Sequence, residues 1–287
     1  MPARGGIQPE LTGAPETLLW TLYHRSVEAR RPDGVLHDPY AIELVERLDY
    51  PFEQRFGAAQ HLAQWQALRA LCFDREVRRF LAAQPDGTVV ALGEGLETQF
   101  WRVDNGRVSW LSVDLPETVA LRNRLLPRSP RLRTVAASAL DESWMDDVDG
   151  SRPVLVTAQG LLMYFERADV HRLVAGCARR FSGAGLLFDT VPEWLGARSR
   201  QGALKTEGYQ APPWLWSVDR AEERALAALP NIIELRALRL PRGRGLALGY
   251  ALPLLMRSPA LRRAMPSVFR ARFGTTEPHA AVHASST

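Results

Sequence analysis

Two glycines one residue apart, Gly93 and Gly95, follow the apolar and β-branched stretch 88–92. A strand that runs into such a pair and then into a helix is suited to hold an anionic ligand. Gly93 would permit the tight turn, Gly95 would let a ligand approach bare backbone, and a helix beginning near Leu96 would direct free N–H groups at negative charge. Alone, such a pair is more often an ordinary loop, so other residues must decide.

An acidic residue stands where a second strand would end. The strand-like run 107–113 leads directly into Asp114. In doubly wound folds a carboxylate here, 114 − 93 = 21 residues after the first glycine, accepts hydrogen bonds from both ribose hydroxyls. The third glycine of a dinucleotide fingerprint would fall at position 98, where this chain has Thr98. Because that glycine accompanies a pyrophosphate, the pattern favours S-adenosylmethionine over NAD.

The elements that must position these residues alternate between strand-like and helix-like patterns. Short apolar runs separated by helical periodicity predict an α/β fold with a mostly parallel, seven-stranded sheet. The predicted strands are 88–92, 107–113, 132–136, 153–157, 185–190, 231–240 and 245–251. The carboxyl ends of the parallel strands would meet at one edge of the sheet, which brings Gly93 and Asp114 together.

Helical periodicity dominates the chain before the first strand. Apolar residues recur there at three- and four-residue spacing, and Asp38 is suited to cap one of the helices. The predicted helices cover 14–27, 40–48 and 61–83. The expected organisation is a flexible N-terminus 1–12, a single domain 13–274 with a helical cap 13–84 and a lid insertion 191–228, and a flexible tail 275–287.

The composition indicates a soluble protein of a reducing compartment. The 287 residues contain no apolar run of about 18 residues that could span a membrane, and no secretory signal is readable. Cys72 and Cys177 lie in apolar helical patterns, which favours buried thiols and a cytoplasmic location over a disulfide framework. The densest basic regions, 241–244 and 257–272, interleave with core-like residues and carry no nucleic-acid-binding motif. We therefore expect no membrane partner, no nucleic-acid partner and no metal, and leave a homodimer open.

Six segments keep a common order along the chain. They are ETLLWTLYHRSVEAR at 16–30, RALCFD at 69–74, GEGLET at 93–98, VDLP at 113–116, SALD at 138–141 and TAQGLLMYF at 157–165. Each motif alone is unspecific, but the ordered set resembles the leucine carboxyl methyltransferase family, and within it the bacterial polyketide O-methyltransferases. The resemblance weakens after Asp189, in the part of the chain that would determine substrate specificity.

The resemblance implies a class I, Rossmann-like methyltransferase that uses S-adenosylmethionine. Carried over by position, Arg69 would pair with the methionine carboxylate and Asp114 with the ribose hydroxyls, while Ala139 and Leu140 would flank the adenine. For Arg69, a salt bridge on a helix surface is the alternative. The resemblance completes the cofactor site with Gly93, Gly95, Leu115 and Ser138.

One position departs from the pattern of many relatives. Gln159 would face the methionine amino group, where the leucine-directed relatives have Glu. A neutral amide accepts a hydrogen bond from an ammonium group but supplies no charge. The strength of that contact therefore depends on the surroundings of Gln159.

The methyl acceptor is expected to be a small aromatic, polyketide-type molecule. Residues that could contact it are Trp20, Tyr23, Tyr164 and Trp214. A carboxylate acceptor is ionised near neutral pH and needs no general base, whereas a phenol with a pKa of about 10 would need one. His24 is the only base candidate, and a lone helical histidine is more often structural. We favour methylation of a carboxylate or acidic phenol; the alternatives are an NAD-dependent oxidoreductase and a noncatalytic S-adenosylmethionine-binding protein or cyclase.

Overall fold

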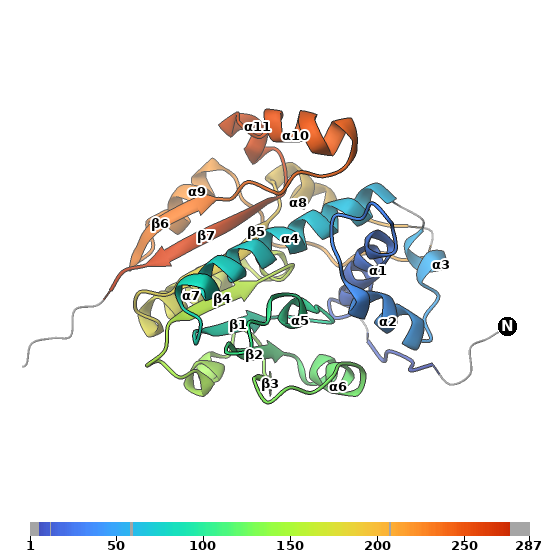
Figure 1. Cartoon of the computed structure of the whole chain (residues 1–287). Helices are drawn as coiled ribbons and strands as arrows, with labels where there is room; N and C mark the ends of the chain where they lie inside the picture. Colours follow the sequence, from blue (N-terminus) through green and yellow to red (C-terminus); the bar gives the residue numbers. More distant parts are fainter. Residues whose placement is uncertain (1–5, 12, 58–59, 207, 276–287) are drawn as a thin grey trace, which may run out of the picture.

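One seven-stranded sheet forms the centre of the part of the chain that the structure describes, residues 6–11, 13–57, 60–206 and 208–275. In this computed structural model the strand order is β3-β2-β1-β4-β5-β7-β6, and β7 runs antiparallel to both neighbours (Figure 1). The strands are β1 (Thr88–Leu92), β2 (Ser109–Asp114), β3 (Leu132–Ala136), β4 (Val154–Ala158), β5 (Gly185–Thr190), β6 (Ile232–Ala237) and β7 (Ser267–Phe273). The predicted fold class is confirmed, and the strand order reverses between β1 and β4.

Helices cover both faces of the sheet and its carboxyl edge. The α-helices are α1 (Thr17–Ala29), α2 (Pro39–Arg47), α3 (Phe52–Phe56), α4 (Gln60–Ala83), α5 (Gln99–Val103), α6 (Pro116–Leu125), α7 (Arg167–Arg180), α8 (Glu193–Arg200), α9 (Arg220–Ala227), α10 (Leu252–Leu255) and α11 (Pro259–Arg263). Shorter helical turns are η1 (Glu142–Asp147), η2 (Leu162–Tyr164) and the π-helical η3 (Ala247–Ala251). Asp38 caps α2 as predicted, because its carboxylate accepts a hydrogen bond from the Ala41 N–H at 3.1 Å.

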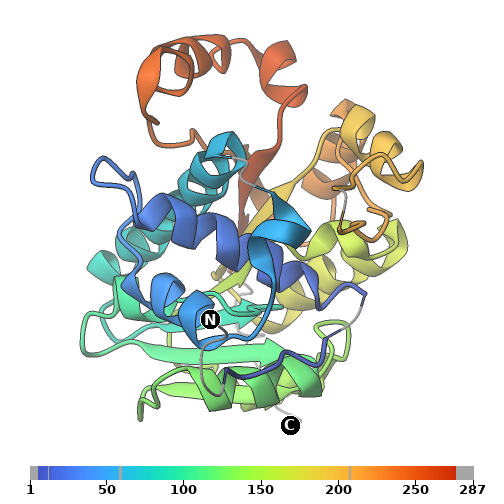
Figure 2. The same ribbon diagram turned by 90° about the vertical axis from the view of Figure 1, so that its right-hand side faces the viewer.

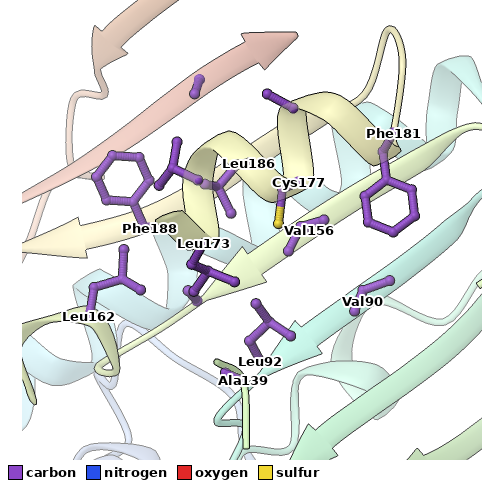
Figure 3. Packing of buried hydrophobic residues seen from close by; sticks show 14 of the residues in the cluster. Val90, Leu92, Ala139, Val156, Leu162, Leu173, Cys177, Phe181, Leu186 and Phe188 are labelled. Atoms are coloured by element: carbon purple, nitrogen blue, oxygen red, sulfur yellow. The ribbon is translucent and has the colours of Figure 1, made fainter. Parts of the chain in front are cut away.

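The two faces of the central strands pack against different helices because successive side chains point to opposite sides. On one face, Val90 of β1 and Val156 of β4 belong to the same buried cluster as Cys177 of α7 (Figure 3). On the other face, Val89 of β1 packs in a cluster with Phe73 of α4. Every residue of β1 and β4 is buried, which explains why both read as continuous apolar runs.

The last strand differs from the prediction. The stretch 245–251 is helical instead of extended, and the seventh strand is Ser267–Phe273. In that strand Phe269, Ala271 and Phe273 are buried, while the alternating Arg270 and Arg272 form ion pairs at its surface. The arginines alternate with buried side chains, so this strand has a period-two pattern and lacks the continuous apolar run that marks β1 and β4.

The N-terminal helices belong to the core of the domain. Leu19 and Leu22 of α1 are fully buried, in a cluster that also contains residues of α2, α3 and α6. Residues 6–11, predicted to belong to a flexible N-terminus, contact the domain: Ile7 pairs with Leu48, and Leu11 is buried. Residues 1–5, 12 and 276–287, where flexible ends were also predicted, lie outside the described residues.

Candidate functional site

A cavity of about 170 Å³ lies at the carboxyl ends of β1, β2 and β4, beneath the start of α1. This edge, next to the reversal of strand order, is where open α/β sheets bind ligands. Nine of the predicted site residues line it: Arg69, Gly93, Gly95, Asp114, Leu115, Ser138, Ala139, Gln159 and Tyr164. Leu140 does not line the cavity but packs against the adjoining hydrophobic core.

The glycine loop after β1 turns as the sequence predicts. Gly93 and Gly95 have φ values of 57° and 56°, a left-handed conformation that costs glycine little. A β-carbon at Gly93 would lie 2.6 Å from the Leu161 side chain. The helix that follows begins at Gln99 and not near Leu96 as predicted, and Gln99 lines the cavity. The Gly95 N–H is engaged, because it donates to the Asp114 carboxylate at 2.7 Å.

Asp114 lies at the end of β2, where a ribose is expected. Its two carboxylate oxygens accept hydrogen bonds from the N–H groups of Gly95 and Leu115, at 2.7 and 2.8 Å. Each oxygen keeps a second lone pair for a hydroxyl. Burial raises the pKa of Asp114, and the two N–H groups partly oppose that rise. The backbone thus fixes the orientation of this carboxylate.

Arg69 of α4 reaches the cavity from the opposite side and pairs with Asp189 at 2.9 Å. This pair is largely buried, so the alternative of a surface salt bridge is excluded. Asp189 also accepts a hydrogen bond from the Gly160 N–H at 2.6 Å. Sequence reasoning did not assign Asp189 a role, although it stands near the end of β5 much as Asp114 ends β2. The buried Nε of Arg69 has no hydrogen-bond partner among the described residues.

Gln159 follows β4 and is oriented by Glu97, a residue that sequence reasoning did not select. The Gln159 amide nitrogen donates to the Glu97 carboxylate at 2.9 Å. The reverse orientation would place the amide oxygen against that carboxylate, so Glu97 determines which end of the amide is free. The buried amide oxygen has no hydrogen-bond partner among the described residues.

Glu97 remains ionised next to this amide. Burial acts to raise the pKa of Glu97, but the charges of Arg102 and Arg25 outweigh it and hold the pKa at about 2. Glu97 also lines the cavity. An ionised carboxylate, itself paired with Arg25 and Arg102, therefore lies next to the neutral amide.

Beneath the loop lies a buried network of ion pairs centred on Arg102. Its guanidinium contacts Asp74 at 2.8 Å, Glu97 at 2.8 Å and Asp38 at 2.9 Å. The Thr98 hydroxyl donates to Asp38 within the same network and is fully buried. Position 98, where a dinucleotide fingerprint would require glycine, is thus committed to holding α2 and α5 together.

The predicted acceptor-side residues are only partly brought together. Tyr164 lines the cavity, and burial raises its pKa. Trp214 is not among the cavity-lining residues, but its side chain interacts with Tyr164, and this contact acts to lower the Tyr164 pKa against the effect of burial. Within the predicted lid 191–228, Trp216 is buried in the main core, which supports an anchoring role for that side chain.

Three aromatic residues of α1 lie away from the cavity. Trp20 and Tyr23 pack against the buried cluster that contains Leu19 and Leu22. There the Tyr23 ring stacks on Phe52 with centroids 5.6 Å apart. His24 is buried between them, with its Nδ1 at 2.7 Å from the Trp20 carbonyl oxygen. Burial lowers the pKa of His24. None of the three lines the cavity, so the structure does not bring the predicted base to the cofactor site.

The cavity fits S-adenosylmethionine on the chemistry of its walls. It combines a fixed carboxylate at the ribose position, an unpartnered amide oxygen for an ammonium group, and a guanidinium for a carboxylate. Asp114, Gln159 and Arg69 supply these groups. Among the described residues there is no cluster of three or more potential metal ligands and no helix long and apolar enough to span a membrane.

Comparisons of sequence agree with this site. A profile of the leucine carboxyl methyltransferase family matches residues 19–178. The chain is 38% identical over 185 residues to the tetracenomycin polyketide synthesis O-methyltransferase TcmP of Streptomyces glaucescens, covering 64% of this chain and 68% of that protein. It is 30% identical over 192 residues to the S-adenosyl-L-methionine-dependent methyltransferase dpfgK of Gibberella zeae, covering 61% of this chain and 64% of that protein.

Comparisons of structure give more distant similarities. Human N-acetylserotonin methyltransferase in complex with SAM is 14% identical, with a TM-score of 0.45 over 91% of this chain and 68% of that protein. PigF with SAH is 13% identical, with a TM-score of 0.48 over 90% of this chain and 69% of that protein. At these TM-scores the similarities carry no argument.

Proposed function

This chain belongs to the leucine carboxyl methyltransferase family and is an S-adenosylmethionine-dependent methyltransferase; on that premise we propose that it methylates a carboxylate or acidic phenol of a small aromatic, polyketide-type molecule. The proposal on the acceptor draws support from the similarity to the tetracenomycin polyketide synthesis O-methyltransferase TcmP of Streptomyces glaucescens. Membership of the family, together with Thr98 in the ion-pair network, removes the NAD-dependent oxidoreductase from consideration.

The observation that supports this choice of acceptor is that the carboxylates at the cavity are already engaged. Glu94 pairs with Arg122 at 2.8 Å, Glu97 pairs with Arg102 at 2.8 Å, and Asp114 accepts hydrogen bonds from two backbone N–H groups. No histidine is among the residues that line the cavity, and the one tyrosine there, Tyr164, has its pKa raised by burial. Tyr164 is therefore a neutral hydrogen-bond donor at physiological pH. An acceptor oxygen that is already ionised needs no residue to remove its proton, which fits a carboxylate or an acidic phenol.

The chain's own residues contribute by holding and aligning the reactants. Bound S-adenosylmethionine supplies an electrophilic methyl group on a sulfonium. Asp114 fixes the ribose, while Gln159 and Arg69 hold the two ends of the amino-acid portion. In-line displacement requires the acceptor oxygen, the methyl carbon and the sulfur to be aligned. Rigid contacts at both ends of the cofactor would therefore accelerate the reaction by holding this alignment. Leu18 and Leu161, which line the cavity, help to exclude water from the methyl group.

The test uses label transfer from methyl-labelled S-adenosylmethionine to matched aromatic acceptors. One acceptor carries a carboxylate, the second its carboxamide, and the third an acidic phenol without a carboxylate. We expect label in the acid, recovered as a base-labile ester, or in the phenol, recovered as a base-stable ether, and none in the amide. Transfer to the amide would contradict the proposal. Retained S-adenosylhomocysteine binding without transfer to any acceptor would support the noncatalytic alternative.

The pH dependence of the same assay separates the two acceptors. Transfer to a carboxylate should stay level across neutral pH, because the acceptor is fully ionised there. The rate of transfer to a phenol should rise with pH until the pH exceeds the pKa of that phenol. A pH profile that follows neither acceptor would indicate a titrating protein group and would contradict methylation without a base.

A further inference from the structure

The connection between β6 and β7 projects away from the rest of the domain. Figures 1 and 2 show α10 and α11, drawn in orange, at the periphery of the domain; η3 precedes them in the chain, and Arg262 and Arg263 of α11 reach back to Glu223 of α9. Neither α10 nor α11 has a buried residue, and η3 buries only Gly249. We call residues 245–263 the projecting segment. It adds almost nothing to the hydrophobic core.

The projecting segment nevertheless carries large apolar side chains. Of the ten exposed large apolar residues among those that the structure describes, five belong to it: Leu246, Tyr250, Leu254, Leu255 and Leu261. Leu246 is 81% exposed and Tyr250 is 70% exposed. Leu246, Tyr250 and Leu254 recur every four residues, which places them along one side of a helical path. A cluster of this kind is unusual on a monomer surface and marks an interaction site.

The charge around the projecting segment has one sign. From Leu235 to Thr275 the sequence contains nine arginines and no aspartate or glutamate. Several of these arginines pair with carboxylates elsewhere in the domain, for example Arg262 and Arg263 with Glu223. Arg242 and Arg257 are exposed and form no ion pair among the described residues. Free positive charge therefore accompanies the exposed apolar cluster.

We propose that the projecting segment docks this enzyme on a membrane surface that contains anionic lipids. Leucine and tyrosine side chains flanked by arginine are the composition of peripheral segments that lie in the interface between headgroups and acyl chains. The contact is interfacial and spans nothing, which agrees with the lack of a spanning helix among the described residues. The proposal departs from the sequence-based expectation of no membrane partner, which considered only spanning runs.

Two features favour a lipid surface over a protein partner. The segment that carries the exposed apolar side chains protrudes from the rest of the domain (Figure 2), so these side chains can enter the headgroup region of a bilayer. A second copy of the projecting segment would bring further unpaired arginines and no acidic residue to the interface, and like charges at an interface oppose association. Anionic lipid headgroups complement Arg242 and Arg257 at once.

Co-sedimentation with vesicles of phosphatidylcholine mixed with phosphatidylglycerol tests the proposal, with phosphatidylcholine vesicles as the reference. We expect binding to the mixed vesicles that weakens with added salt. The Arg242→Ala/Arg257→Ala variant should lose about 30-fold in partitioning, because each basic residue near an anionic surface contributes about fivefold. The Leu254→Asp/Leu255→Asp variant should no longer sediment with either vesicle.

The matched control is Leu62→Asp/Ile233→Asp, which places the same two charges on exposed apolar residues of α4 and β6, outside the projecting segment. It should bind vesicles like the wild type. S-Adenosylhomocysteine binding checks that each variant is folded. Equal sedimentation of the wild type and the Leu254→Asp/Leu255→Asp variant, or equal binding to both vesicle types, would overturn the proposal. Wild-type dimerisation that this variant abolishes, without vesicle binding, would assign the surface to a second copy and also overturn it.

Discussion

Two connections that leave the same edge of the sheet have opposite character. The loop Gly93–Thr98 after β1 buries nearly all of its side chains and places its charged groups in ion pairs. The projecting segment after β6 buries almost none of its side chains and leaves its apolar residues in water. Because β7 is antiparallel to β5 and β6, β6 runs parallel to β5, and both connections start at carboxyl ends. The burial of a connection therefore depends on whether it forms the cavity, as the loop after β1 does, and not on the edge of the sheet from which it starts.

The largest expected effect lies in the ion-pair network beneath the glycine loop. Arg102→Met should reduce the free energy of unfolding by about 3–5 kcal/mol, because Asp38, Asp74 and Glu97 would remain as buried carboxylates without their shared cation. Urea unfolding followed by circular dichroism measures it. The control is Arg107→Met, which breaks an exposed pair with Asp86 and should change stability little. Equal effects of both variants would mean that burial of the network does not matter.

The next effect concerns the ribose end of the cofactor. Asp114→Ala should weaken S-adenosylhomocysteine binding by about 2–3 kcal/mol, because two hydroxyls lose a charged acceptor. Isothermal titration calorimetry measures this loss. Unchanged affinity would show that Asp114 only closes the glycine loop through Gly95.

Acid should weaken the same contact. Burial raises the pKa of Asp114, so its ionised form is lost at a higher pH than for an ordinary aspartate. Affinity for S-adenosylhomocysteine should be full above this raised pKa and should fall as the pH drops through it, because a protonated carboxyl accepts fewer hydrogen bonds. Titration calorimetry across this range should show the fall for the wild type. Asp114→Asn, which cannot titrate, should show weaker binding without it.

A somewhat smaller effect is expected at the amino-acid end. Arg69→Ala should weaken S-adenosylmethionine by about 1.5–3 kcal/mol and adenosine far less, since only the former carries the carboxylate. The control is Arg75→Ala on the same helix, because Arg75 does not line the cavity. If both ligands lost affinity equally on Arg69→Ala, the arginine would support the fold through Asp189 instead.

The smallest effect should come from the projecting segment. Leu255→Asp should change the free energy of unfolding by no more than about 0.5 kcal/mol, because the side chain is exposed and its helix buries nothing. Urea unfolding of this variant and of Arg102→Met compares the two losses in the free energy of unfolding. A loss as large as that of a core substitution would show that the segment packs on the domain.

The sequence allowed the sheet, the glycine loop and Asp114 to be predicted because each has a local pattern. Strands β1 and β5 begin and end where predicted, since both are continuous apolar runs with clear boundaries. Strand β7 was missed because Arg270 and Arg272 interrupt its apolar pattern. The cofactor contacts of Arg69 and Asp114, and the roles of the acceptor-side residues, stay predictions.

The partners of these residues could not be predicted because they depend on contacts between distant parts of the chain. Asp189 meets Arg69 across 120 positions, and Glu97 meets Gln159 across 62. The sequence around each of these residues does not distinguish it from a polar residue on the protein surface. Glu97 lies within a recognised motif, and the lack of charge at Gln159 was the available signal that another residue had to supply it.

The antiparallel course of β7 has a consequence for how this protein could be altered. Strands β6 and β7 are neighbours in the sheet, so the projecting segment between them amounts to a long hairpin connection. Such a connection can be shortened or exchanged while the two strands keep their register. The fold thus places the cofactor site and the projecting segment on separate elements. The segment can therefore change in length or sequence without any change in the residues that line the cavity.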